Sequence, residues 1–334
     1  MPVQTTDVVY MKSAVVNDTS LNGGEMSYLQ VVDAVSSNIF PTISQAKRIA
    51  GSTGEWRKIF VKNKESTGLG LYNSRVYIEN PTPAGDMVFL AAGTLTDKQS
   101  DLTTPRLYGC GWLNSSVAAG ATTALVIVED GAVHIFEPND IIRVSDKETV
   151  DDLVGNEEYV TVSTATYDGD VATLVFTPAL VNNYSATNQA TRVSSLLNTA
   201  TIQSSISTPV VTSASGQYDH TTYPIVADNR GSIRQNITLT FTSSTAFTLT
   251  GDTLGSLGAG NISGINCSPN NPNMSAPYFT INATGFSGTF ALGDSITFTV
   301  TPSAKGLWLK RVIPPNTASQ AGNRFVLVTE GESE

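Results

Sequence analysis

The sequence is poor in the residue types that build reactive centres, with two cysteines and two histidines in 334 residues. Cys110 and Cys267 lie far apart, so they suggest no disulfide framework, and neither has the spacing of a zinc motif. We therefore predict two buried thiols. His134 and His220 leave few groups for acid–base catalysis near neutral pH, and we interpret His220 as a surface loop residue. We expect no cofactor and no metal.

Recognisable catalytic motifs are missing as well. The sequence has no phosphate-binding loop, no zinc-protease helix motif and no nucleophile elbow. The glycine pairs at 68–70 and 109–111 lack the strand–glycine–helix setting of a dinucleotide fold. The oxygen-rich stretch 146–158 lacks the spacing of an EF-hand loop, so we interpret it as a solvated or partner-facing loop. With only three tryptophans for a sugar-binding cleft, we predict that the protein is not an enzyme.

Charged residues make up only 14% of the chain, and the net charge is −10 with a pI of about 4.7. An acidic chain lacks the basic footprint that neutralises phosphates, so we expect no nucleic-acid partner. No stretch approaches the roughly 18 apolar residues of a membrane span. The N-terminus lacks the basic and then apolar pattern of a secretory signal. We expect a soluble protein, made in a cytoplasm, with no membrane partner.

The sequence is rich in two-residue alternation of apolar and polar side chains, which is the pattern of strands with one buried face. The alternation is clearest in SIRQNITLTF and SITFTVTP. The residues expected to face a core there are Ile233, Ile237, Leu239, Phe241, Ile296, Phe298 and Val300. Outward threonines and Gly- and Asn-rich turns favour antiparallel sandwiches. The predicted fold class is mainly β, with several small antiparallel sandwich or barrel domains of Ig-like type and little helix near the N-terminus.

Four regions are expected: an N-terminal arm with a short helix, a small β-domain, an acidic β-domain and an Ig-like β-sandwich, at residues 1–50, 51–113, 114–200 and 201–334. The arm lacks regular alternation, so we expect neighbouring subunits to hold it. Its helix is predicted between Pro41 and Gly51. In the acidic domain, Asp168-Gly169 predicts a two-residue hairpin turn. The glycine-rich segment 251–264 is expected to be an ordered loop.

The C-terminal residues 305–334 predict two further strands, which have two possible places. They can complete the sandwich of residues 201–304, to which they are contiguous, or they can return to pack on residues 51–95. We favour the contiguous arrangement because sequential elements are usually spatial neighbours. Trp308 is expected to be a core residue in either case, with Leu307 and Leu309 facing the opposite side.

Charges are segregated along the chain, with seven basic residues from Lys47 to Arg75 and twelve acidic residues from Glu129 to Asp170. Opposite patches on one chain suit a head-to-tail ring, in which the basic face of each subunit meets the acidic face of the next. We therefore predict a salt-sensitive homo-oligomer. The candidate subunit-contact residues are Lys47, Arg48, Arg57, Lys58, Lys62, Lys64, Arg75, Asp146, Glu148, Asp151, Asp152, Glu157 and Glu158.

The basic strand EWRKIFVKN at 55–63 leaves three interpretations open. Lysine stems can cover apolar neighbours while their ammonium groups reach water, and lysines also discourage edge-to-edge pairing. We favour this solvated strand over a partner-docking surface, and the docking surface over a nucleic-acid site.

Two groups of segments carry a family resemblance. Near the C-terminus they are ITLTFTSSTAFTLTGDTLGSLGAG, PYFTINATGFSGTFALGDSITFTVTPSAKGLWLKRVIPP and NRFVLVTEGE, and near the N-terminus they are VVYMKSAVVNDTS and SNIFPTIS. Together they resemble virion structural proteins of tailed bacteriophages. The resemblance covers most of the chain, is weakest over 81–120 and contains no catalytic motif.

The resemblance implies a virion component with Ig-like β-domains, assembled in the host bacterial cytoplasm. We expect a ring or decoration at the head–tail neck, such as a collar, built through contacts with copies of itself and with other neck or tail proteins. The alternative is a baseplate or tail-fibre attachment protein. An alternative of another class is a host-surface carbohydrate-binding module or depolymerase.

Overall fold

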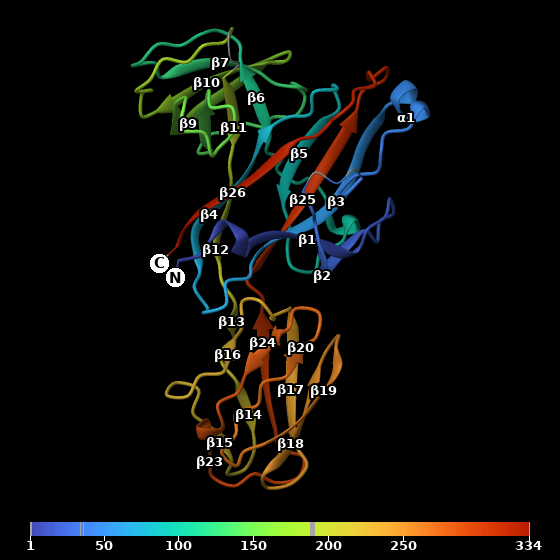
Figure 1. Ribbon diagram of the computed structural model, residues 1–334, viewed down its shortest axis with the longest axis vertical. Helices are drawn as coiled ribbons and strands as arrows, with labels where there is room; N and C mark the ends of the chain where they lie inside the picture. The colour runs from blue at the N-terminus through green and yellow to red at the C-terminus, as the bar shows by residue number, and fades with distance from the viewer. Residues whose placement is uncertain (1, 34, 36, 188–190, 334) are drawn as a thin grey trace.

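The chain is mainly β, as predicted, and forms three β units arranged along its longest axis (Figure 1). The computed structural model describes residues 2–33, 35, 37–187 and 191–333. A central sandwich lies between a closed barrel and a second sandwich, which we call the distal sandwich. Both outer units are insertions into the central one.

The central sandwich consists of a five-stranded and a three-stranded antiparallel sheet. The larger sheet has the order β2-β1-β3-β25-β5, with β1 at Val8–Val15, β2 at Gly23–Gln30, β3 at Ser52–Asn63, β5 at Met87–Ala92 and β25 at Ala304–Ile313. The smaller sheet has the order β12-β4-β26, with β4 at Leu71–Asn80, β12 at Leu197–Ile202 and β26 at Val326–Ser333. Ile59, Leu307 and Leu309 from the larger sheet share one core with Val76 and Ile78 from the smaller.

The C-terminal strands return to the N-terminal half of the chain, so the contiguous arrangement that we favoured is wrong. β25 pairs with both β3 and β5, and β26 pairs with β4. Trp308 is fully buried, as predicted, and its ring meets Trp56 edge-on with the ring centroids 6.3 Å apart. β25 carries apolar side chains on both faces, which suits an interior strand that is buried on both faces of its sheet.

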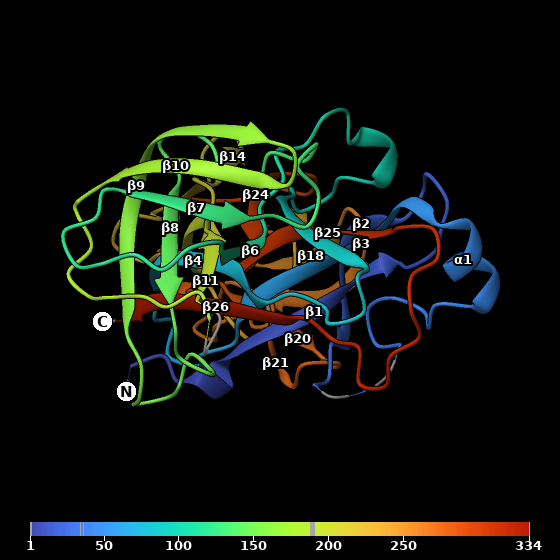
Figure 2. The same cartoon turned by 90° about the horizontal axis from the view of Figure 1, so that it is seen from above.

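Strands between Cys110 and Ser195 close into the barrel, with the order β10-β7-β6-β11-β8-β9. Their bounds are Cys110–Leu113 (β6), Thr123–Ile127 (β7), Ile141–Ser145 (β8), Glu157–Asp168 (β9), Val171–Thr177 (β10) and Arg192–Ser195 (β11). The predicted hairpin is confirmed, because Asp168 pairs directly with Val171. Closure leaves this unit without an open sheet edge (Figure 2).

The distal sandwich is built on a sheet with the order β13-β24-β17-β18-β19, and β14 also pairs with β24. The strands are Ser205–Ile206 (β13), Val210–Thr212 (β14), Gln235–Phe241 (β17), Ala246–Gly251 (β18), Gly255–Asn261 (β19) and Ser295–Thr301 (β24). The predicted alternation is confirmed for six of the seven residues, since Ile237, Leu239, Phe241, Ile296, Phe298 and Val300 are all buried, whereas Ile233 precedes β17 and is half-buried. The glycine-rich segment that we expected to be a loop contains β19, which forms a hairpin with β18.

Short elements complete the distal sandwich and the connections. Three two-stranded sheets pair Gln217–Tyr218 (β15) with Phe286–Ser287 (β23), Val226–Ala227 (β16) with Phe279–Thr280 (β22), and Asn270–Asn271 (β20) with Ala276–Pro277 (β21). The 3-10 helices are Thr5–Asp7 (η1), Gln99–Asp101 (η2) and Ala283–Gly285 (η3). No helix in the described part of the chain has the length and apolar character needed to cross a membrane.

The N-terminal segment is not an arm without a core, as we had expected. β1 pairs with β3 and places Val9 and Met11 in a small cluster with Phe60. Irregular register between β1 and β2 disturbs the alternation that a regular strand pair would show. The predicted helix is confirmed as α1 at Gln45–Ala50, where the Ser44 side chain caps the first turn.

Replacing Trp308 tests the returned strand. We expect Trp308→Ala to lower the free energy of unfolding by about 3–5 kcal/mol, because it leaves a cavity beside Trp56 and removes the indole donor of Asp97. The control is Leu292→Ala, at a side chain that is 78% exposed, with an expected change within about 0.5 kcal/mol. Denaturant unfolding of the full chain measures both, and equal small effects would contradict the assignment.

Candidate subunit-contact surfaces

The basic residues of β3 lie inside the protomer. β3 is an interior strand between β1 and β25, and Arg57, Lys58 and Lys62 are all buried. The Lys58 ammonium pairs with Asp97 at 2.5 Å and donates to the Gly24 carbonyl at 2.7 Å. The interpretation of a solvated strand whose ammonium groups reach water is therefore wrong. These three residues are also unavailable as charges on an exposed basic face.

The other basic candidates are mostly engaged within the chain. Lys47 pairs with Glu55. Arg48 donates to the Ala318 carbonyl at 2.7 Å, and Arg75 lies 4.0 Å from Glu330. Lys64 is half-buried beside the distal sandwich. The seven residues thus serve separate contacts and do not form one basic face.

The acidic candidates divide into anchoring and exposed residues. Glu158 accepts from the backbone amides of Val181 and Asn182 at 2.7 and 2.8 Å. These bonds outweigh the burial that opposes ionisation and hold the pKa of Glu158 below its usual value. Asp146 and Asp152 cap turns of their own loop by accepting from Asn156 and Thr149.

The loop 146–156 projects an apolar tip into solvent. Glu148 and Asp151 are exposed on it. Leu153 is 100% exposed and Val154 is almost as open. An isolated pair of bare apolar side chains among carboxylates is compatible with the predicted partner-facing loop.

A buried ionic cluster joins the barrel to the central sandwich. Arg143 of β8 is fully buried and pairs with Glu157 of β9 at 2.5 Å and with Glu79 of β4 at 3.3 Å. The guanidinium also lies over the Tyr77 ring, 5.2 Å from its centroid. The Tyr159 hydroxyl extends the cluster because it lies 2.7 Å from a carboxylate oxygen of Glu157 and 2.7 Å from one of Glu330 of β26, and its single proton is donated to one of them at a time.

The environment of this cluster shifts its carboxyl groups in opposite directions. Burial raises the pKa of Glu79, and Arg143 only partly offsets that effect. At Glu157 burial is outweighed by the hydrogen bonds from Arg143 and Tyr159, so its pKa is lowered. Sequence reasoning missed this cluster because the paired strands β8 and β9 supply only Arg143, Glu157 and Tyr159, whereas Glu79 and Glu330 come from β4 and β26, far away in the chain.

The outer strand of the larger central sheet is the surface most open to a partner. The first residues of β2 bridge to Lys98, but no described strand pairs with its outer side from Met26 to Gln30. Tyr28 and Leu29 are exposed there, Leu29 by 53%. Val32, two residues after the end of β2, is also exposed. An unpaired edge with apolar side chains is a template for strand pairing.

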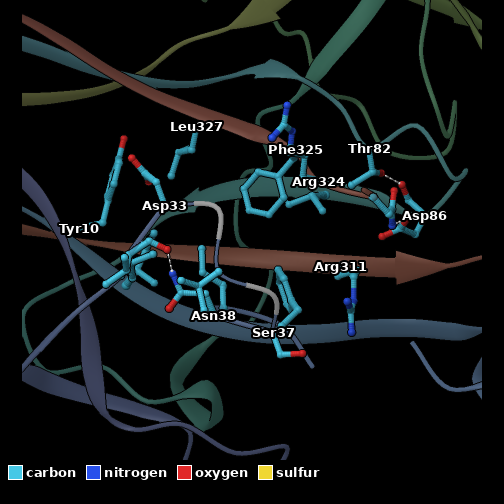
Figure 3. Close-up of a pocket in the computed structure, with 18 of the residues that line it drawn as sticks. Tyr10, Asp33, Ser37, Asn38, Thr82, Asp86, Arg311, Arg324, Phe325 and Leu327 are labelled. Carbon is cyan, nitrogen blue, oxygen red and sulfur yellow. Dashed lines mark hydrogen bonds between the residues drawn. The ribbon is translucent and has the colours of Figure 1, made fainter. Parts of the chain in front are cut away.

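A cavity of about 410 Å³ opens at the edge of the central sandwich near this strand (Figure 3). Its walls include Phe40, Phe325 and Leu327. Its buried polar groups already have partners within the chain: Arg311 donates to Glu55 at 2.8 Å, and Asp86 accepts from Asn323 at 2.7 Å. Neither is a free catalytic group.

The thiols and imidazoles have structural settings. Cys110 is buried, as predicted, and burial raises its pKa to about 12, whereas Cys267 is only partly buried. His134 stacks on Tyr167 with centroids 4.2 Å apart, and His220 accepts from the Ile225 amide at 3.1 Å. Within the described residues, no group of three or more His, Cys, Asp or Glu side chains is placed to hold a metal ion.

Comparison with known proteins gives no relative: no family model, curated protein or solved structure matches the chain.

The ionic cluster predicts a strong effect of removing its cation. We expect Arg143→Met to lower the free energy of unfolding by about 3–5 kcal/mol, because Glu79 remains buried without its counter-ion. Arg324→Met, at an exposed arginine, is the control and is expected to change stability by less than about 0.5 kcal/mol. Urea unfolding of both variants decides, and a small effect of Arg143→Met would show that the cluster does not hold the barrel in place.

Proposed function

We propose that the protein is a non-enzymatic structural component of a tailed-phage particle, which assembles through subunit contacts into a ring or decoration at the head–tail neck. The observation that carries the assembly part is the unpaired outer edge of β2 with exposed Tyr28 and Leu29. The phage assignment rests on the sequence resemblance described above.

The arrangement of the three units supports an assembly role. The units follow one another along the long axis, so the molecule has long lateral sides on which a neighbour can pack (Figure 1). β2 lies on one such side, in the central unit. Stable specific contacts bury on the order of 1,200–2,000 Å² in total, so a ring contact would extend beyond one strand onto neighbouring surfaces.

Strand addition explains why this edge stays apolar. A strand from a neighbour that pairs with Met26–Gln30 satisfies the free backbone groups and covers Tyr28 and Leu29 at the same time. If the paired strand comes from a different face of the next copy, the contact is head-to-tail, and its rotation closes a ring. The projecting tip at Leu153 and Val154 is a second exposed apolar element for such contacts.

A carboxylate introduced at this edge tests the proposed contact. We expect Leu29→Asp to dissociate the homo-oligomer, because a carboxylate at the edge must be desolvated in the contact. Leu292→Asp makes the same change at an exposed leucine of the distal sandwich and should leave assembly intact. Sedimentation velocity over a concentration series measures both variants. Wild-type protein that stays monomeric, or a Leu29→Asp variant that assembles like wild type, would contradict the proposal.

The place in the particle needs a separate experiment. In a cryo-electron microscopy map of the intact virion, the proposal expects the three-unit shape in a ring between head and tail. Density at the baseplate or at a tail-fibre attachment point would contradict the neck location, but it would not contradict the proposed contact at β2.

A further inference from the structure

A cavity of about 340 Å³ lies at the junction between the central and distal sandwiches. We call it the junction cavity. β1 and β3 contribute Met11 and Lys62, Lys64 follows directly after β3, and the distal sandwich contributes Arg230 and Met274. The outer face of the larger central sheet thus forms one wall and loops of the distal unit form the other.

Lys62 is the unusual member of this lining. Its neighbours across the sheet are Val9 and Ala304, and its side chain is only 1% exposed. The ammonium group donates to the Ser232 carbonyl at 3.2 Å, and no described carboxylate lies within the 4.0 Å of an ion pair. An ammonium group has three donors, and burying it without a counter-ion is costly.

Lys58 shows what the same strand does with a satisfied lysine. It lies on the same face of β3, four residues earlier, and its ammonium group meets Asp97 and two backbone carbonyls. Lys62 has one carbonyl partner and borders an open volume. The difference between the two environments is therefore a missing negative charge at the junction cavity.

The other charged groups around Lys62 leave the cavity positive. Lys64 and Arg230 line it with Lys62, whereas Asp7 is the only carboxylate among the described residues that line it, and it already accepts from the Gln4 amide at 2.9 Å. Tyr28 of β2 also lines the cavity, and Asp228 acts on Lys62 only through its more distant charge. Burial dominates and lowers the pKa of Lys62 to about 7.

We propose that the junction cavity binds an oxyanion, which pairs with the buried Lys62 ammonium group and is held from the mouth by Lys64 and Arg230. The volume admits a compact anion such as a sulfate, phosphate or carboxylate group. Because the lining comes from both sandwiches, the bound anion bridges them. The same chemistry is available from a dissolved oxyanion and from an acidic side chain of a second copy.

Binding is linked to protonation of Lys62. The anion favours the charged amine, so affinity is full below the pKa of Lys62 and falls as the pH rises above it. Sulfate is the probe because it stays fully charged over this range. We expect one saturable site per chain by isothermal titration calorimetry at about pH 6, and affinity about thirtyfold weaker at about pH 8.5, because only about one in thirty Lys62 side chains is then protonated.

Variants separate this site from non-specific attraction. Lys62→Met should abolish sulfate binding, and Lys98→Met, at an exposed lysine, should leave it unchanged. Lys62→Arg keeps its charge at both pH values and should bind sulfate with little pH dependence. Absence of a saturable site in the wild type at about pH 6, or full binding by Lys62→Met, would overturn the proposal.

The effect of sulfate on the oligomeric state identifies the source of the natural anion. Sulfate that dissociates a homo-oligomer as it fills the site assigns the natural anion to a carboxylate of a second copy. Sulfate binding with unchanged sedimentation assigns it to a dissolved oxyanion. Either result supports the site.

Discussion

The position of β25 between β3 and β5 is the constraint on which the rest of the structure depends. β25 lies near the end of the chain, and both of its partners lie near the beginning. Leu307 and Leu309 fill the core of the central sandwich while Trp308 fills the opposite face of the sheet. Each outer unit therefore connects at one end to the larger sheet, through β5 or β25, and at the other end to β12 of the smaller sheet, which makes both units insertions into the central sandwich.

Buried charge marks both junctions of the central sandwich. Toward the barrel, Arg143 meets carboxylates from β4 and β9. Toward the distal sandwich, Lys62 donates to Ser232, and Ser303 donates to the carbonyl of Asn229 at 2.7 Å. A chain with few charged residues thus uses several of them between its units. Directional polar contacts of this kind fix the relative orientation of two packed surfaces more narrowly than apolar contact does.

Local sequence patterns correctly predicted several individual strands, one turn and the helix. Alternation identified the strands around Leu239 and Phe298, turn chemistry identified the hairpin after Asp168, and the limits set by Pro41 and Gly51 identified α1. The return of β25 could not be read in this way, because pairing between distant strands leaves no local period. The rule that sequential elements are neighbours predicted the wrong partner strands for β25, because an inserted unit separates β25 in sequence from β3 and β5.

The candidate contact residues show the same limit. Lysine and arginine are usually surface residues, so we expected Lys58 and Arg57 on a basic face. In the structure, β3 lies between β1 and β25, and both side chains are buried. The apolar edge at Tyr28 and Leu29 gave no signal in the sequence, because exposure there follows from the outer position of β2 in the sheet. Glu148 and Asp151, on a polar loop, lie on the surface as their chemistry suggests.

Amide hydrogen exchange of the intact chain, followed by mass spectrometry through increasing denaturant, tests most directly that both ends of the chain form one sheet. The account predicts that peptides covering β25 lose protection together with β3 and β5 in one cooperative unit, because these strands share their hydrogen bonds. Loss of protection in β25 together with β17 and β24 of the distal sandwich, while β3 stays protected, would contradict it.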